Sequence, residues 1–276
     1  MLTNQLTDDQ LLSRCSLGSR SGVSVISIGD SQTGHLLPML NLLNERLGLG
    51  VMYYSTDGIN FPSLIEERST GDFPSDFMEK HQKMLQVFDY YTNRSKPNDI
   101  LLLSSRYELR WGEYPIPQSQ RQLKFTYYDD KGSKIATKDA LGKWENAFNT
   151  LIERALSKGL RVVIFNPIPT FQYPLPPSPQ WFNKLAYARS SQQYFTRSEL
   201  INHYQKVSDV LKSLQERHSN VFVFDAFGVL CPPPDSRQCL PDSYRDQVHL
   251  STTGAEKMYP AFSSFLLNNF PGIDKP

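Results

Sequence analysis

The chain has 276 residues, 39% of them hydrophobic and 21% charged, which is enough for one large domain with a substantial core. Its net charge is only +1, so the composition does not favour a polyanionic partner such as a nucleic acid. No apolar run approaches the roughly 20 residues that span a membrane. The first residues, Met1–Gln5, lack the basic and apolar segments of a signal peptide.

Apolar, β-branched runs alternate with amphipathic stretches along the chain. Five parallel strands are predicted at Val23–Ile28, Gly50–Tyr54, Asp99–Ser104, Arg161–Phe165 and Val221–Asp225. Helices are predicted at Leu36–Leu47, Ser75–Thr92, Asp139–Lys158, Arg197–His218 and Thr253–Asn269. We expect Ser251 or Thr253 to cap the last helix, with Glu256 completing a capping box on Thr253. The alternation predicts an α/β fold, a three-layer α/β/α sandwich around a five-stranded parallel sheet.

Two insertions interrupt the alternation, at residues 105–141 and 168–195. The first contains a predicted hairpin over Lys124–Ala136, with Gly132 in its turn. The second is rich in Pro and aromatic residues. No internal repeat or long linker divides the chain. We therefore predict a single domain over residues 1–276, in which residues 1–20 form an N-terminal extension.

Two short segments near the ends of the chain bear most directly on function. Gly29-Asp30-Ser31 follows the first predicted strand, and Asp246-Gln247-Val248-His249 precedes the last predicted helix. A serine hydroxyl is a poor nucleophile until a base removes its proton, and an acid fixes the tautomer of that base. We predict Ser31 as nucleophile, His249 as base and Asp246 as the orienting acid. The competing interpretation is a turn serine and a surface histidine.

The remaining histidines and cysteines are weaker candidates. His35 follows Ser31 by one helical turn, which would place it below the serine, and no acid is placed to orient it. His81, His203 and His218 lie in helical stretches among polar residues, where we expect them to be solvated. No metal-ligand spacing such as HExxH or CxxC is present, so we predict no metal and no other cofactor.

Cys231 and Cys239 bracket a seven-residue, proline-rich loop. This spacing fits either a short disulfide or two free thiols, and Cys15 is left over.

Polar residues also follow other predicted strands, where parallel sheets bind their ligands. They are Asp57-Gly58, Ser105-Arg106 and Asn166-Pro167. We expect the backbone N–H groups of Ser31 and Gly58, with the Arg106 guanidinium, to stabilise an oxyanion. The competing interpretations are a plain turn glycine and a surface ion pair.

Several other side chains are possible contacts for a substrate. Asn166 could orient substrate or cap its own loop. Trp111, Tyr173 and Trp181 could form a carbohydrate platform, or could pack their loops onto the body of the protein.

The segments around Ser31 and His249 resemble the SGNH (GDSL-type) hydrolases. The likeness is closer to the extracytoplasmic SGNH domain of type-three membrane acyltransferases, which O-acetylate surface polysaccharides. It covers nearly the whole chain, through Ile28–Ser31, His35–Pro38, Tyr54–Gly58, Asp99–Tyr107, Phe165–Pro169 and Cys231–Ser251. The resemblance implies a bridged Cys231–Cys239 pair and a domain that faces the periplasm or cell exterior, within or beside a membrane protein.

The chain departs from the family pattern at three places. Ser105-Arg106 stands where the wider family has an oxyanion-binding Asn, although the polysaccharide-acetylating branch likewise carries Arg there. Gln32 replaces a His that many members of that branch have after the serine. Ile59 replaces a Cys often found there, which leaves Cys15 without that partner.

The function expected from these residues and this resemblance is serine-dependent O-acyl transfer, with acetyl as the acyl group. The acceptor is a cell-surface glycan, and a membrane acyltransferase domain could deliver the acyl donor. One alternative is a free-standing carbohydrate or lipid esterase of the SGNH type. Another is an inactive glycan-binding module, against which the intact Ser31, Asp246 and His249 argue.

Overall fold

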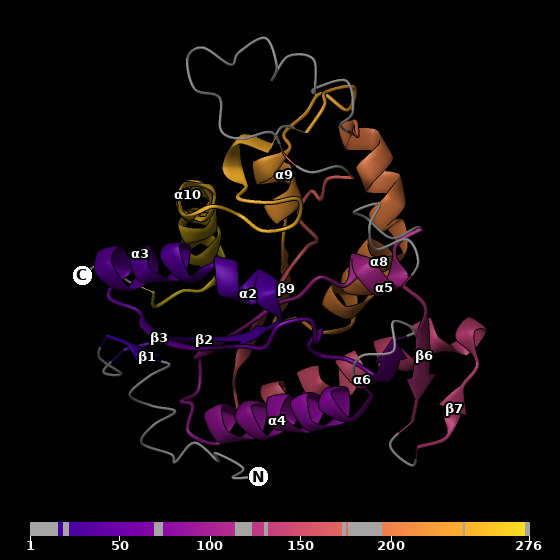
Figure 1. Cartoon of the computed structure of the whole chain (residues 1–276). Coiled ribbons are helices and arrows are strands. Elements are labelled where there is room, and N and C mark those ends of the chain that lie inside the picture. Colours follow the sequence, from indigo (N-terminus) through magenta and orange to yellow (C-terminus); the bar gives the residue numbers. More distant parts are fainter. Residues whose placement is uncertain are drawn as a thin grey trace.

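The computed structural model describes residues 16–18, 22–68, 74–113, 123–129, 132–172, 175, 195–239 and 241–273. Its centre is a six-stranded sheet in the order β1-β3-β2-β5-β8-β9 (Figure 1). The strands are β1 (Ser16–Leu17), β2 (Ser24–Gly29), β3 (Gly50–Ser55), β5 (Ile100–Ser104), β8 (Arg161–Phe165) and β9 (Val221–Phe224). All neighbours pair in parallel except β1, which is antiparallel to β3 at the edge.

Helices cover both faces of this sheet, which explains why most residues of its strands are apolar and buried. Successive residues of β2 point to opposite faces, so Val25 packs in one core cluster, and Ile26 and Ile28 in the other. The first cluster takes in α3 and α10, and the second takes in α4, α6 and part of α8. The helices are α2 (Ser31–His35), α3 (Leu37–Leu47), α4 (Pro74–Thr92), α5 (Glu108–Trp111), α6 (Thr137–Ser157), α8 (Arg197–Arg217), α9 (Ala226–Leu230) and α10 (Thr252–Asn269), with a 3-10 turn, η3, at Pro241–Ser243.

A second, three-stranded antiparallel sheet lies beside the first, in the order β4-β6-β7. Strands β6 (Phe125–Tyr128) and β7 (Lys134–Ile135) form the hairpin predicted in the first insertion. Its turn residues Asp130 and Lys131 lie outside the described residues. Strand β4 (Ile65–Arg68) joins the hairpin from a distant part of the chain and was not predicted.

The predicted α/β layers and five parallel strands are confirmed, with three differences. The short edge strand β1 makes the sheet six-stranded. The predicted helix Leu36–Leu47 is α3, which begins at Leu37, and the short helix α2 before it was not predicted. Ser251 caps α10 with its Oγ accepting the Gly254 N–H at 3.1 Å, so the predicted capping box on Thr253 is wrong. Ser251 is still extended, whereas Thr253 is already helical and cannot be the cap.

A disulfide joins Cys231 and Cys239, whose Cα atoms are 5.1 Å apart, and closes the loop that follows α9. Cys15 lies outside the described residues. No helix in the part of the chain that the structure describes is long and apolar enough to cross a membrane.

At Gly29 the strand β2 lies too close to its neighbour β5 for a side chain. A Cβ at this position would lie 1.9 Å from the Ser104 carbonyl oxygen and 2.3 Å from Thr33 Oγ1. The Ser104 oxygen also accepts the Thr33 hydroxyl at 2.7 Å, so neither atom is free to withdraw. Gly29 thus lets the turn that carries Ser31 seat tightly against the end of β5.

We therefore expect Gly29→Ala to lower the free energy of unfolding by about 3 kcal/mol, because the new methyl group overlaps backbone. The matched control is Gly142→Ala in α6, where nothing lies within 4 Å of the added Cβ. Removing a helical glycine should stabilise that variant by up to about 1 kcal/mol. Urea unfolding measures both, and equal stability of the two variants would contradict this account of Gly29.

Candidate active site

Ser31 is the first residue of α2, directly beyond the end of β2. Asp30 caps the helix, with its Oδ1 accepting the Gln32 N–H at 2.8 Å. Its Oδ2 accepts the Arg106 N–H at 2.9 Å, which ties the turn to the chain leaving β5. Burial raises the pKa of Asp30, against these two hydrogen bonds, which lower it. The two hydrogen bonds of the buried Asp30 carboxylate therefore hold the turn in place, and Ser31 on it is half-buried.

Ser31, His249 and Asp246 form a continuous series of hydrogen bonds. His249 Nε2 lies 2.8 Å from Ser31 Oγ, and His249 Nδ1 lies 2.9 Å from Asp246 Oδ2. Burial opposes ionisation of Asp246. Even so, hydrogen bonds from the Val248 N–H and from the ring and N–H of His249 bring its pKa below the ordinary value. An ionised Asp246 favours the His249 tautomer with its proton on Nδ1, which leaves Nε2 free to accept the serine proton.

Two side chains of α2 hold the loop that carries His249. Gln32 Nε2 donates to the Val248 carbonyl at 2.7 Å, and the Leu250 N–H donates to His35 Nδ1 at 3.2 Å. His35 therefore carries its own proton on Nε2, which has no partner among the described residues. It makes no hydrogen bond to Ser31. Burial lowers the pKa of His35 to about 3; His249 and Arg245 add to this effect and Asp246 opposes it.

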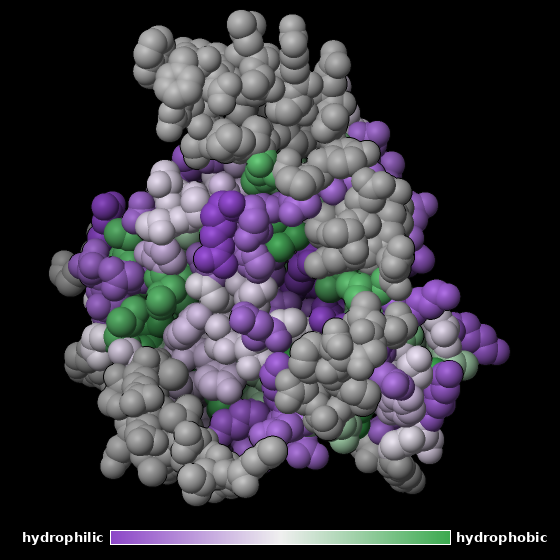
Figure 2. All heavy atoms as spheres, in the orientation of Figure 1, coloured by the Kyte–Doolittle hydropathy of each residue, from purple (hydrophilic) through white to green (hydrophobic). Residues whose placement is uncertain are grey.

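A cavity of about 320 Å³ opens beside Ser31 and His249. Figure 2 shows hydrophilic residues gathered around a hollow between the positions of α2 and α5. Gly58 and Arg106 line this cavity with Ser31 and His249, so three of the predicted strand ends meet there. Within the described residues, neither the Ser31 nor the Gly58 backbone N–H has a hydrogen-bond partner. Both donors are therefore available to a ligand.

Gly58 belongs to a network of buried charges that the sequence analysis missed. Its φ of +77° is one that glycine adopts without strain. Its carbonyl accepts hydrogen bonds from Arg68 and, at 2.8 Å, from Arg110. Arg110 also donates through Nε to Glu66 at 3.0 Å and through Nη1 to Asn60 at 2.8 Å. This fixes the orientation of the peptide that follows Gly58.

Arg106 is buried rather than on the surface, with 6% of its side chain exposed. Its Nε lies 3.3 Å from Glu108 Oε1, so the ion pair considered in the sequence analysis exists but lies inside the protein. Burial lowers the pKa of Arg106 and raises that of Glu108 to about 7, although the Arg106 charge opposes the latter change. Arg106 still lines the cavity beside Ser31.

Two other predicted contact residues, Asn166 and Trp111, are not in the described lining of this cavity. Asn166 Oδ1 accepts the Ser208 hydroxyl at 3.3 Å, and Asn166 is absent from the described lining. Trp111 is 9% exposed and stacks on Tyr127 with ring centroids 4.9 Å apart. Tyr173 and Trp181 lie outside the described residues.

The expectation that His203 is solvated is wrong, because only 1% of it is exposed. It lies on the face of α8 that also carries Leu200 and Val207, three residues before and four after it. His81 and His218 are half-buried and bond to Ser63 and Asn149 respectively. No group of three potential His, Cys, Asp or Glu metal ligands is found among the described residues.

The fold and this site define an SGNH-type protein. A family model described as the SGNH domain (fused to AT3 domains) matches residues 3–264, and the chain belongs to this family. No curated protein sequence matches the chain.

Solved structures with the same fold are only distantly similar in sequence. The periplasmic domain of a lipopolysaccharide acetyltransferase from Salmonella ser. Paratyphi A has a TM-score of 0.53 and 14% identity, over 90% of this chain and 85% of that one. A putative acylhydrolase from Bacteroides fragilis has a TM-score of 0.50 and 9% identity, over 97% of each chain. A variant of an acetyl-xylooligosaccharide esterase from Geobacillus has a TM-score of 0.50 and 12% identity, over 92% of this chain and 95% of that one.

The buried neutral His35 should make the protein sensitive to acid. The unfolded chain binds a proton at His35 near pH 6.5, whereas the folded protein binds it only near 3, so lowering the pH favours unfolding. Between about pH 6.5 and about pH 4.5 this difference should remove about 2–3 kcal/mol from the free energy of unfolding. The His35→Asn variant keeps an acceptor for the Leu250 N–H but has no titrating ring. Over the same pH range its free energy of unfolding should therefore fall by about 2–3 kcal/mol less than that of the wild type. Urea unfolding at the two pH values tests this, and identical losses in both proteins would contradict it.

Proposed function

We propose that this protein is an O-acyltransferase that moves an acetyl group onto a hydroxyl of a cell-surface glycan through an acyl-Ser31 intermediate. The observation that carries the proposal is the 2.8 Å contact between Ser31 Oγ and His249 Nε2, with Asp246 on the far side of the ring. Membership of the SGNH family found fused to AT3 domains supports acyl transfer.

In the first half-reaction His249 removes the proton of Ser31 as Oγ attacks the carbonyl carbon of the acyl donor. The tetrahedral intermediate collapses when the carbon–oxygen bond to the leaving group breaks. His249 then returns its proton to that leaving oxygen. The products are the deacylated donor and an ester on Ser31.

In the second half-reaction a glycan hydroxyl attacks the ester carbonyl and gives its proton to His249. Collapse of the second tetrahedral intermediate forms the glycan ester, and the proton on His249 returns to Ser31 Oγ. Water in place of the glycan hydroxyl would make the protein an esterase. Asp246 stabilises the charged imidazole in both halves and does not itself take the proton.

The negative charge of each tetrahedral intermediate requires preorganised donors. The N–H groups of Ser31 and Gly58 supply two, since both lack a partner within the described part of the chain. Arg106 lines the same cavity and supplies a charged donor. Glu66 and Arg110 act one step further back: Arg110 holds the carbonyl of Gly58, next to the peptide group that carries the Gly58 N–H, and Glu66 holds Arg110.

An extracytoplasmic location fits this assignment, with the acyl group delivered by a membrane acyltransferase domain. The Salmonella structure of the same fold is the periplasmic domain of a lipopolysaccharide acetyltransferase, and the family occurs fused to AT3 domains. The second candidate is a carbohydrate esterase, because an acetyl-xylooligosaccharide esterase shares the fold. One domain over the whole chain accommodates either function.

Acetylation of Ser31 is the first expected outcome. After incubation with 4-nitrophenyl acetate, mass spectrometry of peptides should find one acetyl group on the peptide that contains Ser31. Ser31→Ala should abolish this adduct with the fold retained, and His249→Ala should reduce it as severely because the two residues act together. Acetylation of Ser31→Ala at the wild-type rate would overturn the proposal. The same reaction with a glycan present separates transfer to sugar from hydrolysis.

Arg106→Ala should lower kcat about a hundredfold, with little change in KM, if its guanidinium contacts the oxyanion. Arg106→Lys should restore only part of the rate, because an ammonium lacks the fork of donors. Glu108→Gln is the control, since it removes the same ion pair and leaves the guanidinium in place. Equal loss of kcat in Arg106→Ala and Glu108→Gln would assign Arg106 to structure alone.

A further inference from the structure

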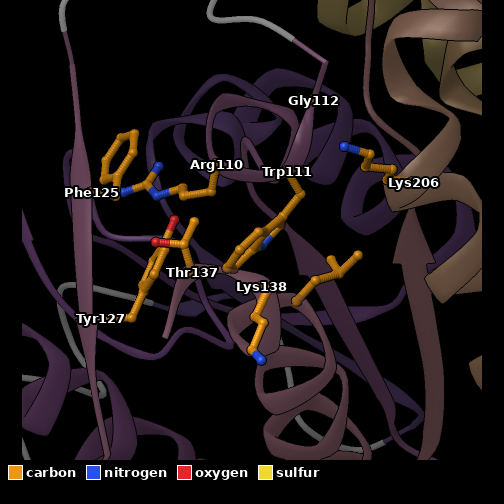
Figure 3. A pocket seen from close by; sticks show the side chains of 9 residues that line it. Arg110, Trp111, Gly112, Phe125, Tyr127, Thr137, Lys138 and Lys206 are labelled. Atoms are coloured by element: carbon orange, nitrogen blue, oxygen red, sulfur yellow. The ribbon is translucent and has the colours of Figure 1, made fainter. Parts of the chain in front are cut away.

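A second cavity, of about 370 Å³, adjoins the one beside Ser31 (Figure 3). Arg110 belongs to the lining of both cavities. The walls of the second cavity come from four elements, α5, β6, α6 and α8, and the first three of these lie within or border the first insertion. Its volume falls in the range of roughly 300–1,000 Å³ that is usual for small-molecule sites.

Aromatic rings form much of its wall. Trp111 and Tyr127 stack at 4.9 Å with 24° between their planes, and Trp144 supports Trp111 from behind at 5.5 Å. Phe125 is half-buried, with the Arg110 guanidinium 5.1 Å from its ring centroid. The stacked rings cover each other's faces, so Trp111 and Tyr127 support the wall of the cavity, and the half-buried Phe125 and Leu141 give it more open apolar surface.

The described lining of this cavity carries an excess of positive charge. Lys138 at the start of α6 and Lys206 on α8 both line it and are exposed, and Figure 3 shows Lys206 extending inward from α8. Within the described part of the chain, neither lysine forms an ion pair, and no Asp or Glu lines the cavity. Arg110 is already paired with Glu66. Two ammonium groups are thus left to a ligand.

We propose that this second cavity binds a negatively charged sugar residue of the acceptor, one that bears a carboxylate or a phosphate group. The inference rests on the proposed function. The apolar surface of Phe125 and Leu141 suits the C–H groups of a sugar ring, and the ammonium groups of Lys138 and Lys206 pair with its anionic group. Because Arg110 borders both cavities, a neighbouring sugar of the same glycan reaches the cavity of Ser31.

The test is binding of defined probes, measured by calorimetry or by ligand-observed NMR. Digalacturonic acid and glucose 6-phosphate carry the two anionic groups, and galactobiose and glucose are their neutral counterparts. We expect one or both anionic probes to bind more tightly than the matched neutral sugar, and added salt to weaken that binding. Which anionic probe binds identifies the group as carboxylate or phosphate.

Lys138→Gln/Lys206→Gln should weaken that binding about tenfold, since each exposed ion pair contributes up to about 1 kcal/mol. The control is Lys143→Gln/Lys212→Gln, which removes the same charge from α6 and α8 outside the cavity. That variant should bind like the wild type. A similar loss in both double variants would show a general charge effect and would overturn the proposal.

Three other results would also overturn it. These are neutral sugars binding as tightly as anionic ones, wild-type affinity in Lys138→Gln/Lys206→Gln, and inorganic phosphate binding as tightly as the better anionic probe. Formation of acyl-Ser31 is measured in the same wild-type preparation. Protein that acylates Ser31 without binding either anionic probe overturns this inference alone. Protein that binds a probe without acylating Ser31 overturns the proposed function alone.

Discussion

The buried carboxylate of Asp30 is the contact on which the geometry of the site depends. One of its oxygens starts α2, and the other holds the backbone of Arg106 at the end of β5. The Asp30 N–H donates to Ser105 Oγ at 3.2 Å, which also accepts the Phe61 N–H at 3.0 Å. A buried polar group is costly to leave unpaired. The segments that carry Ser31, Gly58 and Arg106 are therefore held at one point and cannot move independently.

The elements and site residues that could be predicted from the sequence are those whose own neighbouring residues form a recognisable pattern. The parallel strands are apolar because both faces are covered, and the long helices show an apolar stripe. Ser31 and His249 could be singled out because one follows a buried strand and the other precedes a helix cap. Asp30 could have been recognised as a helix N-cap by the same reasoning, since Asp is favoured at that position.

The parts that did not follow depend on contacts between distant residues. The pairing of β4 with β6 joins short strands whose own sequences are not distinctive, and β1 has only two residues. Arg110 and Glu66 are 44 positions apart, and each looks like an ordinary surface charge until the second sheet brings them together. His203 was misplaced because its immediate neighbours are polar, although its position on α8 faces inward.

The hydrogen bond between Ser31 and His249 spans 218 positions of the chain. During synthesis Ser31 leaves the ribosome long before His249 exists, so the nascent chain carries an ordinary, unactivated serine. Bringing residues this far apart together costs loop-closure entropy, which the pairing of the intervening strands offsets. In the proposed mechanism Ser31 reacts only when the loop before α10 has brought His249 to it. Acylation of Ser31 would therefore measure the fraction of the protein in which the two ends of the chain are assembled.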